Sequence, residues 1–492
     1  MATPLGPVVN DESGESYNWY QWLKGPGRWS MWILWVCLVQ SISTLANSLP
    51  SSASTYVMSD LNLTDAQFGT AMGMAYEMPF AIGSLIFAFA VAGGLPIRPH
   101  FLLVIGTAIM NVGTTLVGSA YYFGTLCLWR AVAGIGMIML FPAYGSLLDE
   151  ICPPENVGVA WSLFLAFITL GASMSSFVVG SLEDNGSWRI ALHTVGFIAF
   201  CCSPVILFFP PPAPTLRVHV GWRNFRPFRM PETDDTVTLS ECFCRAPVVA
   251  PALPILLLGA LTIDIQGGAW ISFGQLWLVN ERNMTIPEAG DTTGAALIGG
   301  CLTGLLVALF LVDRAAAYFK LNRPQVFAGL MLIILLSSFM ETYSAFGSAW
   351  FYIGFYLVFM QATVGVGQLF ASVQELSPPR IVGTTTAVAQ FLVRCGNVFG
   401  ATVLGFICDA LRDGGDEEPY THVLRIAYSA GAFTIVTALL AARSYEEGKE
   451  ALNVLVGMPP PPDDIYGTKG DVEKKGEERK GPPEQVTKDG WL

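Results

Sequence analysis

The sequence contains little charge for its length. Asp, Glu, Lys and Arg make up 13% of its 492 residues, about half of the ~25% usual in soluble proteins. Hydrophobic residues make up 52%, and the mean hydropathy is +0.51. Because so few charged side chains cannot cover a water-exposed surface of this size, the composition predicts a protein that has lipid as its solvent.

Residues and motifs of common catalytic and metal sites are also scarce. The four histidines show no metal-ligand or nucleophile–base spacing. The ten cysteines are scattered, mostly within apolar stretches, where small buried thiols are common. The sequence has no G-x-x-x-x-G-K-[ST] loop for ATP-driven pumping. We therefore predict no enzyme activity, no metal and no cofactor.

The acidic excess, a formal net charge of −12, lies outside the apolar stretches. Acidic residues gather at 409–418 and in the C-terminal tail, so the charge gives no support for a nucleic-acid partner. Residues 1–29 form a polar segment, predicted to be cytosolic, without the basic and apolar regions of a signal peptide. We expect the first apolar segment to remain in the mature protein.

Apolar segments of about 20 residues, the length that crosses a ~30 Å hydrocarbon core, recur along the chain. About twelve segments qualify. The first six are at 30–57, 68–94, 101–120, 122–148, 157–182 and 190–209, and the second six are at 249–279, 293–312, 325–345, 349–373, 383–409 and 422–442. The sequence predicts an all-α membrane protein with about twelve transmembrane helices.

These spans divide into two halves. A polar linker at 210–248 separates an N-terminal half, 30–209, from a C-terminal half, 249–442, and the charged segment 443–492 is predicted to be a disordered cytosolic tail. A motif repeats at a constant offset of 225 positions, in the pairs Pro153/Pro378, Gly158/Gly383, Gly171/Gly396 and Gly180/Gly405. Because six spans separate the copies, the two halves are predicted to be parallel.

Loop charges and glycosylation motifs predict the same orientation. With the N-terminus in the cytosol, most loop Lys and Arg residues also lie there, as the positive-inside rule requires. The acceptors Asn62, Asn185 and Asn283 then lie on the lumenal or extracellular side, where N-glycosylation occurs. We predict a multi-pass protein with both termini in the cytosol. Plasma membrane and endolysosomal membrane both remain open.

The fourth span and its exit, RAVAGIGMIMLFPAYGSLLDEICPPENVG, resemble a motif of the major facilitator superfamily. The loop AGGLPIRPH, between the second and third spans, departs from the acidic–basic pattern of that family. The resemblance implies two parallel six-helix halves around a central path. Arg130 begins the matching pattern in the fourth span. The positions that match as gating or structural motifs are Gly134, Gly136 and Pro142 in the same span and Asp313-Arg314 after the eighth.

A narrower resemblance covers residues 373–412. This stretch is similar to the Spinster-type lipid transporters in its Pro-Pro-Arg turn, its Gly-Asn pair and its G-x-x-x-D-x-L-R ending. The first span contains QSISTLANSLP and lacks the Asp-Arg pair usual in that branch. The resemblance implies an amphipathic, lysolipid-like substrate.

Four ionisable residues, Glu77, Arg130, Asp264 and Arg394, lie near the middle of predicted spans. A charge at this depth costs about 2.5–3.5 kcal/mol on insertion scales, so it needs a partner or a water-filled cavity. We predict the pairs Glu77–Arg130 and Asp264–Arg394, and a substrate or proton pathway that uses them. Two ion pairs that only hold helices together are the alternative.

Uncharged polar residues extend this predicted pathway. Gln266 lies in DIQGGAW, where the pair Gly267-Gly268 permits a break like those in substrate-binding helices. Gln40 and Asn47 offer polar groups from the first span. Helix packing without a ligand is the competing interpretation for each.

The predicted function is secondary transport of a small organic or amphipathic solute by alternating access, coupled to protons. A lysolipid is one candidate substrate, and a sugar or a carboxylate is its rival. The expected partners are the lipid bilayer, the solute and protons. A transporter-like receptor that binds without net flux is the alternative from another functional class.

Overall fold

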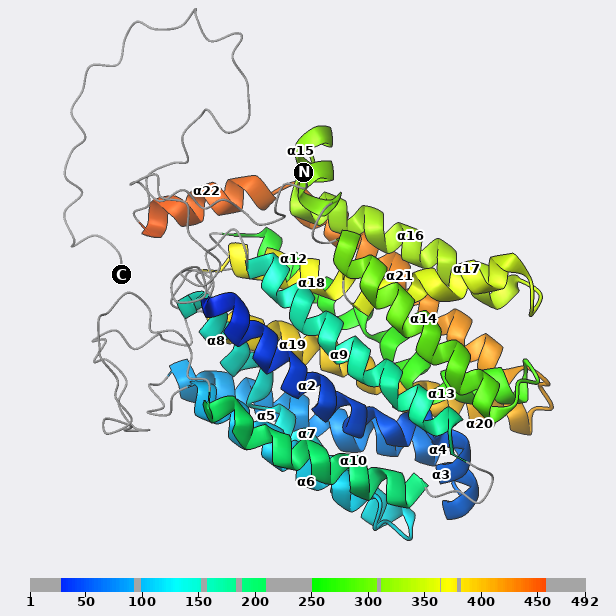
Figure 1. Cartoon of the computed structure of the whole chain (residues 1–492). Helices are drawn as coiled ribbons and strands as arrows, with labels where there is room; N and C mark the ends of the chain where they lie inside the picture. The colour runs from blue at the N-terminus through cyan, green and yellow to red at the C-terminus, as the bar shows by residue number, and fades with distance from the viewer. Residues whose placement is uncertain are drawn as a thin grey trace, which may run out of the picture.

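The computed structural model describes residues 28–92, 99–151, 157–182, 188–208, 250–307, 311–362, 364–377 and 382–456. Within these ranges the chain forms helices joined by turns and has no strand. Most helices run along the long axis of one elongated bundle (Figure 1). The predicted all-α class is confirmed.

The N-terminal half begins at α2 and ends with a 3₁₀ segment after α10. Its elements are α2 (Arg28–Ser52), α3 (Ser54–Leu61), α4 (Asp65–Gly69), the π-helical turn η1 (Thr70–Met74), α5 (Ala75–Ala92), α6 (Pro99–Val117), α7 (Phe123–Met137), α8 (Leu140–Ile151), α9 (Val157–Gly180), α10 (Trp188–Cys202) and η3 (Ser203–Phe208).

The C-terminal half begins at α12, and a last helix, α22, follows it. Its elements are α12 (Ala252–Ile263), α13 (Ile265–Asn280), α14 (Ile286–Leu306), α15 (Val312–Phe319), α16 (Arg323–Tyr343), α17 (Ala349–Val358), the 3₁₀ segment η7 (Phe359–Ala362), α18 (Gly365–Glu375), α19 (Val382–Val398), the π-helical turn η8 (Phe399–Val403), α20 (Leu404–Asp413), α21 (Pro419–Ala442) and α22 (Tyr445–Val456).

Each predicted span coincides with one or more of these helices. Eight continuous helical stretches within the described ranges are long and apolar enough to cross a membrane. The other four predicted spans fall on η1 with α5, α7 with α8, α14, and α17 with α18. Breaks explain part of this difference, because α7 and α8 are separated at 138–139 and α17 is followed by a 3₁₀ turn.

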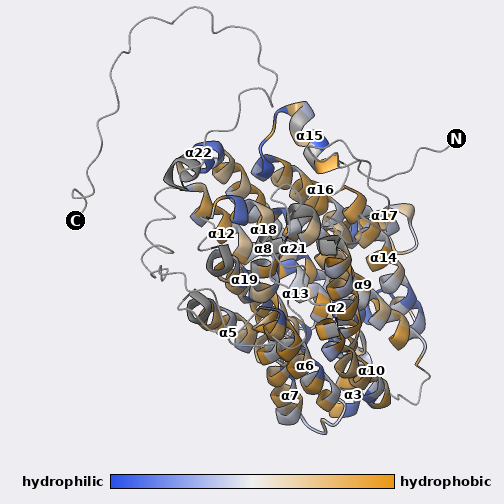
Figure 2. Ribbon diagram, turned by 60° about the vertical axis from the view of Figure 1, so that its left-hand side comes forward, coloured by the Kyte–Doolittle hydropathy of each residue, from blue (hydrophilic) through white to orange (hydrophobic). Residues whose placement is uncertain are grey.

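Large apolar side chains cover the outside of the bundle. Ile86 is 65% exposed, Phe197 62% and Leu336 57%. Hydrophobic residues extend along the sides of the bundle, and hydrophilic residues gather toward α22 and the turn below α15 (Figure 2). Apolar side chains this exposed are stable in contact with lipid tails, so the surface fits a membrane-spanning bundle.

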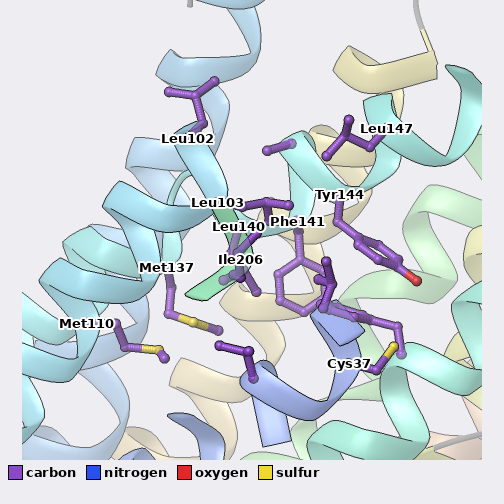
Figure 3. Close-up of a cluster of buried hydrophobic side chains, with 14 of the residues drawn as sticks. Cys37, Leu102, Leu103, Met110, Met137, Leu140, Phe141, Tyr144, Leu147 and Ile206 are labelled. Atoms are coloured by element: carbon purple, nitrogen blue, oxygen red, sulfur yellow. The ribbon is translucent and has the colours of Figure 1, made fainter. Parts of the chain in front are cut away.

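Aromatic and sulfur-containing side chains fill the core of the N-terminal half. Phe141 and Tyr144 of α8 lie beside Met137 of α7 and Cys37 of α2 (Figure 3). The ring centroids of Tyr144 and Phe164 are 3.9 Å apart in a stacked arrangement. This packing fixes the helices that carry polar residues toward the middle of the molecule.

Glycines at equivalent positions of the duplicated motif make the same contact in both halves. A Cβ on Gly171 of α9 would stand 2.1 Å from the carbonyl oxygen of Ser41 in α2. A Cβ on Gly396 of α19 would stand 2.1 Å from the carbonyl oxygen of Leu261 in α12. Only glycine permits this approach, so the fifth helix of each half packs against the first in the same way.

A second duplicated feature lies at one end of the bundle. Asn62 and Asn283 have left-handed backbones, with φ of 51° and 55°. Two residues later, Thr64 and Thr285 cap α4 and α14, each in a reciprocal capping box. Both asparagines are exposed. We call this the sequon end of the bundle, after the two acceptor motifs that it carries.

The two π-helical turns face each other across the halves. In η8 the Thr402 hydroxyl accepts a hydrogen bond from the Met74 N–H at 3.1 Å and donates to the Gly69 carbonyl at 3.3 Å. A Cβ on Gly73 would stand 2.5 Å from the Cβ of Ala401. π-helical turns are frequent at functional sites, and these two lie beside the charged residues described below.

The segment after the last span differs from the prediction. Residues 443–492 were predicted to be disordered, but Tyr445–Val456 form helix α22. The buried Tyr445 donates a hydrogen bond to Glu375 of α18 at 2.6 Å, and Lys449 lies 3.4 Å from the same carboxylate. These contacts hold α22 against the C-terminal half. The rest of the tail, segment 1–27 and the predicted linker at 210–248 lie outside the described residues.

Candidate functional site

A cavity of about 300 Å³ lies between the two halves. Its described lining comes from α2, η1, α5, α6, α7, α8 and α9 of the first half, and from α13, α14, α17, η7, α18, α19 and α21 of the second, with Asp264 between α12 and α13. Its wall combines apolar side chains, among them Met72, Phe141, Trp270 and Phe359, with ionisable ones. The ionisable side chains include Glu77, Arg130, Asp264 and Arg394, so all four predicted charges line one cavity.

Arg394 connects two acidic residues from different halves. Its Nη1 atom lies 3.4 Å from Oε1 of Glu77 in the N-terminal half and 3.6 Å from Oδ2 of Asp264 in its own half. The guanidinium also lies over the ring of Phe80, 5.0 Å from the centroid. Glu77 is 4% exposed, and its second oxygen, Oε2, has no hydrogen-bond partner. The cluster is therefore held by ion pairs but keeps a free acceptor.

Of the two predicted ion pairs, the structure forms Asp264–Arg394 and does not form Glu77–Arg130. Arg130 instead donates from Nη1 to both the carbonyl and the side-chain oxygen of Asn47, at 3.1 Å each. It also lies over the ring of Tyr76, 4.3 Å from the centroid. Asn47 in turn donates to the Tyr76 hydroxyl at 2.8 Å. Arg130 thus has neutral neighbours at short range.

The backbone around Asp264 explains why this carboxylate is available. Helix α12 ends at Ile263 and α13 begins at Ile265, so the break falls on Asp264 itself. The predicted break at Gly267-Gly268 is displaced by one turn. A Cβ on Gly268 would stand 2.3 Å from the carbonyl oxygen of Asn397, whose side chain donates to Asp264 at 3.2 Å. The close approach places α19 against the break.

The other predicted polar residues fall into two groups. Gln266 and Asn47 line the cavity, and both amide atoms of Gln266 are buried without a partner. Gln40 is 3% exposed and does not line the cavity, although its Nε2 also has no partner. The lining therefore includes two of these three residues.

Of the predicted gating and structural motif residues, Gly134, Gly136 and Arg314 are not part of the described cavity lining. A Cβ on Gly134 would stand 2.1 Å from the carbonyl oxygen of Tyr76, and one on Gly136 would stand 2.2 Å from the Met110 nitrogen. These glycines let α7 pack closely on α5 and α6. Pro142 is in α8, and the pair Asp313-Arg314 is in α15, where Arg314 is exposed. The structure does not describe the side chains of Pro142 and Asp313.

At the sequon end an ionic contact joins the two halves. Arg412 of α20 lies 2.6 Å from the fully buried Asp65 of α4, which also accepts a hydrogen bond from the Tyr420 hydroxyl at 2.8 Å. The carboxylate of Asp409 accepts the N–H groups of Asp65 and Ala66 at 3.1 and 3.0 Å, at the start of α4. We call the set Asp65, Asp409, Arg412 and Tyr420 the sequon-end latch.

Burial raises the pKa of the Asp65 carboxyl above its ordinary value of 3.8. The hydrogen bond from Tyr420 and the charge of Arg412 act in the opposite direction, and the charge of Asp409 adds to the increase. Asp65 lies in the first turn of α4, before the second span. Its proton affinity therefore depends on whether the latch is closed.

An aromatic contact joins the halves at the other end. Trp161 of α9 stacks on Phe370 of α18, with ring centroids 5.3 Å apart and planes at 20°. Both side chains are buried. The cavity is thus bounded by contacts between the halves toward both ends of the bundle.

Several residues of this arrangement lie outside the predicted site. Tyr76 and Asn397 contact the predicted charges, and the latch residues close one end. In the sequence, Asp409 and Arg412 stand out as part of the G-x-x-x-D-x-L-R ending, and Asp409 also as the start of an acidic segment. The spacing of Asp65 and Arg412 in the sequence gives no signal, because the contact joins elements of different halves. Asn185, the third predicted glycosylation site, lies outside the described residues.

Comparison with known proteins agrees with this architecture. The sequence profile of the Major Facilitator Superfamily matches residues 36–401. An MFS-type efflux pump of Mycolicibacterium smegmatis is 23% identical over 394 residues, which cover 79% of this chain and 86% of that protein. The uncharacterized MFS-type transporter YceJ of Bacillus subtilis is 23% identical over 349 residues, which cover 70% of this chain and 83% of YceJ.

Solved structures show the same fold. A bacterial homolog of the human lysosomal transporter Spinster, inward-facing and unoccupied, has a TM-score of 0.59 at 18% identity and covers 88% of this chain and 98% of that one. The nucleoside transporter NupG has a TM-score of 0.58 at 12% identity, with coverage of 83% and 99%. The cavity between two helical halves and the match over most of the sequence lead to one conclusion: this chain is a transporter that belongs to the Major Facilitator Superfamily.

Proposed function

We propose that this chain is a secondary active transporter that carries a small organic or amphipathic anion together with protons. The observation that carries the proposal is Arg394, which contacts Glu77 of one half and Asp264 of the other. If one carboxylate takes up a proton, the other still pairs with Arg394. Proton uptake at this site therefore does not leave a buried cation unpaired.

Charge balance supports coupling to protons. With two acidic and two basic residues ionised, the four charges of the cavity sum to zero. Arg130, whose close partners are neutral, is the group proposed to bind an anionic substrate, together with the free amide of Gln266. An enclosed anion adds one negative charge, and one proton on Glu77 or Asp264 offsets it.

The contacts at the two ends support alternating access. The Asp65–Arg412 ion pair and the Trp161–Phe370 stack both join the halves. We propose that each contact opens in turn as the halves rock about the cavity. In the proposed orientation the sequon end faces the lumen or the exterior, and both termini are cytosolic.

The wall of the cavity favours an amphipathic substrate. Trp270, Phe359 and Met72 add apolar surface to a cavity that also carries charged groups. The similarity to an efflux pump and to a Spinster homolog is compatible with this class. A lysolipid, an exported amphipathic compound, and a sugar or carboxylate therefore remain the substrates to compare, and a receptor without flux remains the alternative function.

Uptake into proteoliposomes tests the proposal. The full chain is reconstituted, and labelled lysophospholipid, fucose, a nucleoside and a monocarboxylate are each tested with and without an imposed pH gradient. We expect an amphipathic or carboxylate solute to accumulate only with the gradient. Asp264→Asn and Arg130→Ala should abolish accumulation, whereas the exposed Cys201→Ser, a matched control, should not.

The outcomes separate the candidate functions. Accumulation of a neutral solute, unaffected by Arg130→Ala, would contradict the role of Arg130 as an anion site. Saturable binding of a solute to folded protein without any flux would favour the receptor. Flux that does not respond to the pH gradient would contradict proton coupling and leave a facilitator.

A further inference from the structure

Glu341 is a buried carboxyl group that the proposed site does not use. It lies in the last turn of α16 and has 0% exposure. Its Oε1 accepts a hydrogen bond from the Tyr428 hydroxyl of α21 at 3.2 Å, and its Oε2 has no partner. Of the three buried carboxyl residues in the described ranges, Asp65 and Glu77 each contact an arginine, whereas Glu341 has no ion pair.

Two arginines near Glu341 bind other groups. Arg282 and Arg425 both donate to the carbonyl of Thr342, the next residue, at 3.2 and 2.9 Å. The Arg282 guanidinium lies over Trp277, and that of Arg425 lies over the Tyr343 ring at 3.8 Å. Both arginines are partly exposed and lie toward the sequon end. They are placed to attract a carboxylate but form no ion pair with any carboxylate of the described residues.

The contact with α17 adds no charge. A Cβ on Gly354 would stand 2.7 Å from the Glu341 nitrogen, so the helices touch there through backbone. The groups that face Glu341 are thus one tyrosine hydroxyl and two arginines already bound to a carbonyl. An ionised carboxylate without a paired cation is costly inside a membrane protein, and such a group stays neutral by keeping its proton.

Tyr428 connects this carboxyl group to the central cavity. Its side chain is fully buried yet is part of the cavity lining. One turn further along α21, a Cβ on Gly431 would stand 2.3 Å from Nε2 of Gln266. Gln266 has both amide atoms free and lies two residues from Asp264. Tyr428 thus contacts Glu341 on one side and, on the other, lines the cavity that Gln266 and Asp264 also line.

We propose that Glu341 is a second proton-binding residue, which passes protons between the sequon end and the central cavity through the Tyr428 hydroxyl. In this structure the Tyr428 hydroxyl donates to Oε1 of Glu341, so it first rotates and turns its hydrogen toward the cavity. Glu341 then gives its proton to the Tyr428 oxygen as Tyr428 releases its own to a water or carboxylate in the cavity. The carboxylate that remains is stabilised by Arg282 and Arg425 until it takes a proton from the sequon end. No bond other than O–H forms or breaks.

This inference deepens the proposed function, because it supplies the route for the coupled proton. Its first test needs no transported solute. Infrared spectra of the full-length protein in lipid at neutral pH should contain a protonated-carboxyl C=O band that is absent in Glu341→Gln. The exposed Glu447→Gln should leave the band unchanged. In D₂O the band should shift as the proton exchanges, and Tyr428→Phe should slow this exchange.

The second test uses whichever solute of the panel shows flux. Glu341→Gln should lower pH-driven accumulation by about 10²- to 10⁴-fold, the usual range for loss of a proton-transfer group, but retain exchange of labelled for unlabelled solute. A residue that is only structural would affect both processes or neither. The proposal is overturned if Glu341→Gln removes no protonated-carboxyl band, or if Tyr428→Phe changes neither the isotope exchange nor the pH profile of flux. Failure of the solute panel alone leaves the infrared result decisive.

Discussion

Arg394 of α19 contacts Glu77 of α5 at 3.4 Å, and this ion pair crosses the boundary between the two halves of the molecule. The same guanidinium is 3.6 Å from Asp264, so one cation serves two carboxylates. This sharing has a consequence for stability as well as for transport, because either acid can be neutralised while the other still compensates Arg394.

Single and double neutral variants of the two acids should therefore differ strongly. Glu77→Gln and Asp264→Asn are each expected to change the free energy of unfolding only slightly. The double variant leaves Arg394 buried without a counter-charge, so its free energy of unfolding should fall by about 3–5 kcal/mol. Thermal unfolding of the four proteins in detergent measures the coupling. Additive losses would show that Arg394 depends on only one carboxylate.

Close helix packing at Gly134 should not tolerate a methyl group. A Cβ there would stand 2.1 Å from the Tyr76 carbonyl, so Gly134→Ala must push α7 away from α5, at a cost of about 1–3 kcal/mol. It should also displace Tyr76 from Arg130 and weaken anion binding. The matched control is Gly329→Ala in α16, where nothing lies within 4 Å, and it should stabilise the helix by up to about 1 kcal/mol. Equal melting temperatures for the two variants would contradict the packing argument.

The sequon-end latch should respond to pH. In the closed latch the pKa of Asp65 is raised by burial, whereas an opened latch returns it to its ordinary value. The closed form therefore binds the proton more tightly in the window just above pH 3.8. The closed latch is therefore favoured as pH falls through this window. The stabilisation that protonation of Asp65 gives to the closed latch disappears as pH rises past the raised pKa.

Energy transfer between dyes at the exposed positions Ser59 and Glu417 reports the latch. In a cysteine-depleted full chain, the closed fraction should rise on acidification. Asp65→Asn, which does not titrate, should remove this response while Arg412, Asp409 and Tyr420 remain in place. An unchanged response in Asp65→Asn would assign the pH dependence to another group.

Glycosylation can be tested without disturbing the turns that carry the acceptors. Asn62 and Asn283 have positive φ, so Gly is the replacement that keeps the backbone. Expressed in a eukaryotic host, the chain should show a glycosidase-sensitive shift in mobility, reduced in each Asn→Gly variant. A chain that shows no shift would argue against the predicted orientation or against use of these acceptors.

The span positions could be predicted because apolar length is a local property of the sequence. The depth of Glu77, Arg130, Asp264 and Arg394 followed from the same property, and all four line the cavity. Their pairing followed only in part, because Asp264–Arg394 forms as predicted but Glu77 pairs with Arg394 and not with Arg130. It depends on the rotation of each helix and on which residues meet across the halves, and a count of one acid and one base per half contains neither.

Two of the glycosylation motifs also contain a structural signal, because the sequence around them is duplicated. N-L-T-D-A-Q-F-G and N-M-T-I-P-E-A-G share Asn, Thr and Gly at the same spacing. The structure explains Asn by a left-handed turn and Thr by an N-cap, so the duplication is visible in local geometry alone. The helix at Tyr445–Val456 could not be predicted from its charge and low hydropathy. It is held by a few contacts with distant residues, above all the hydrogen bond from Tyr445 to Glu375.

The π-helical turn η1 stands in the chain between the α4 cap and Glu77. A π turn accommodates one more residue than an α turn, and one residue rotates everything beyond it by about 100° around the helix axis. In genetic terms it is equivalent to the insertion of a single codon. Deleting one residue of Thr70–Met74 would leave the sequence of α5 unchanged but would turn the Glu77 side chain away from Arg394. The number of residues in this five-residue turn therefore determines the direction of the Glu77 side chain, just as the codon for Glu77 determines its chemistry.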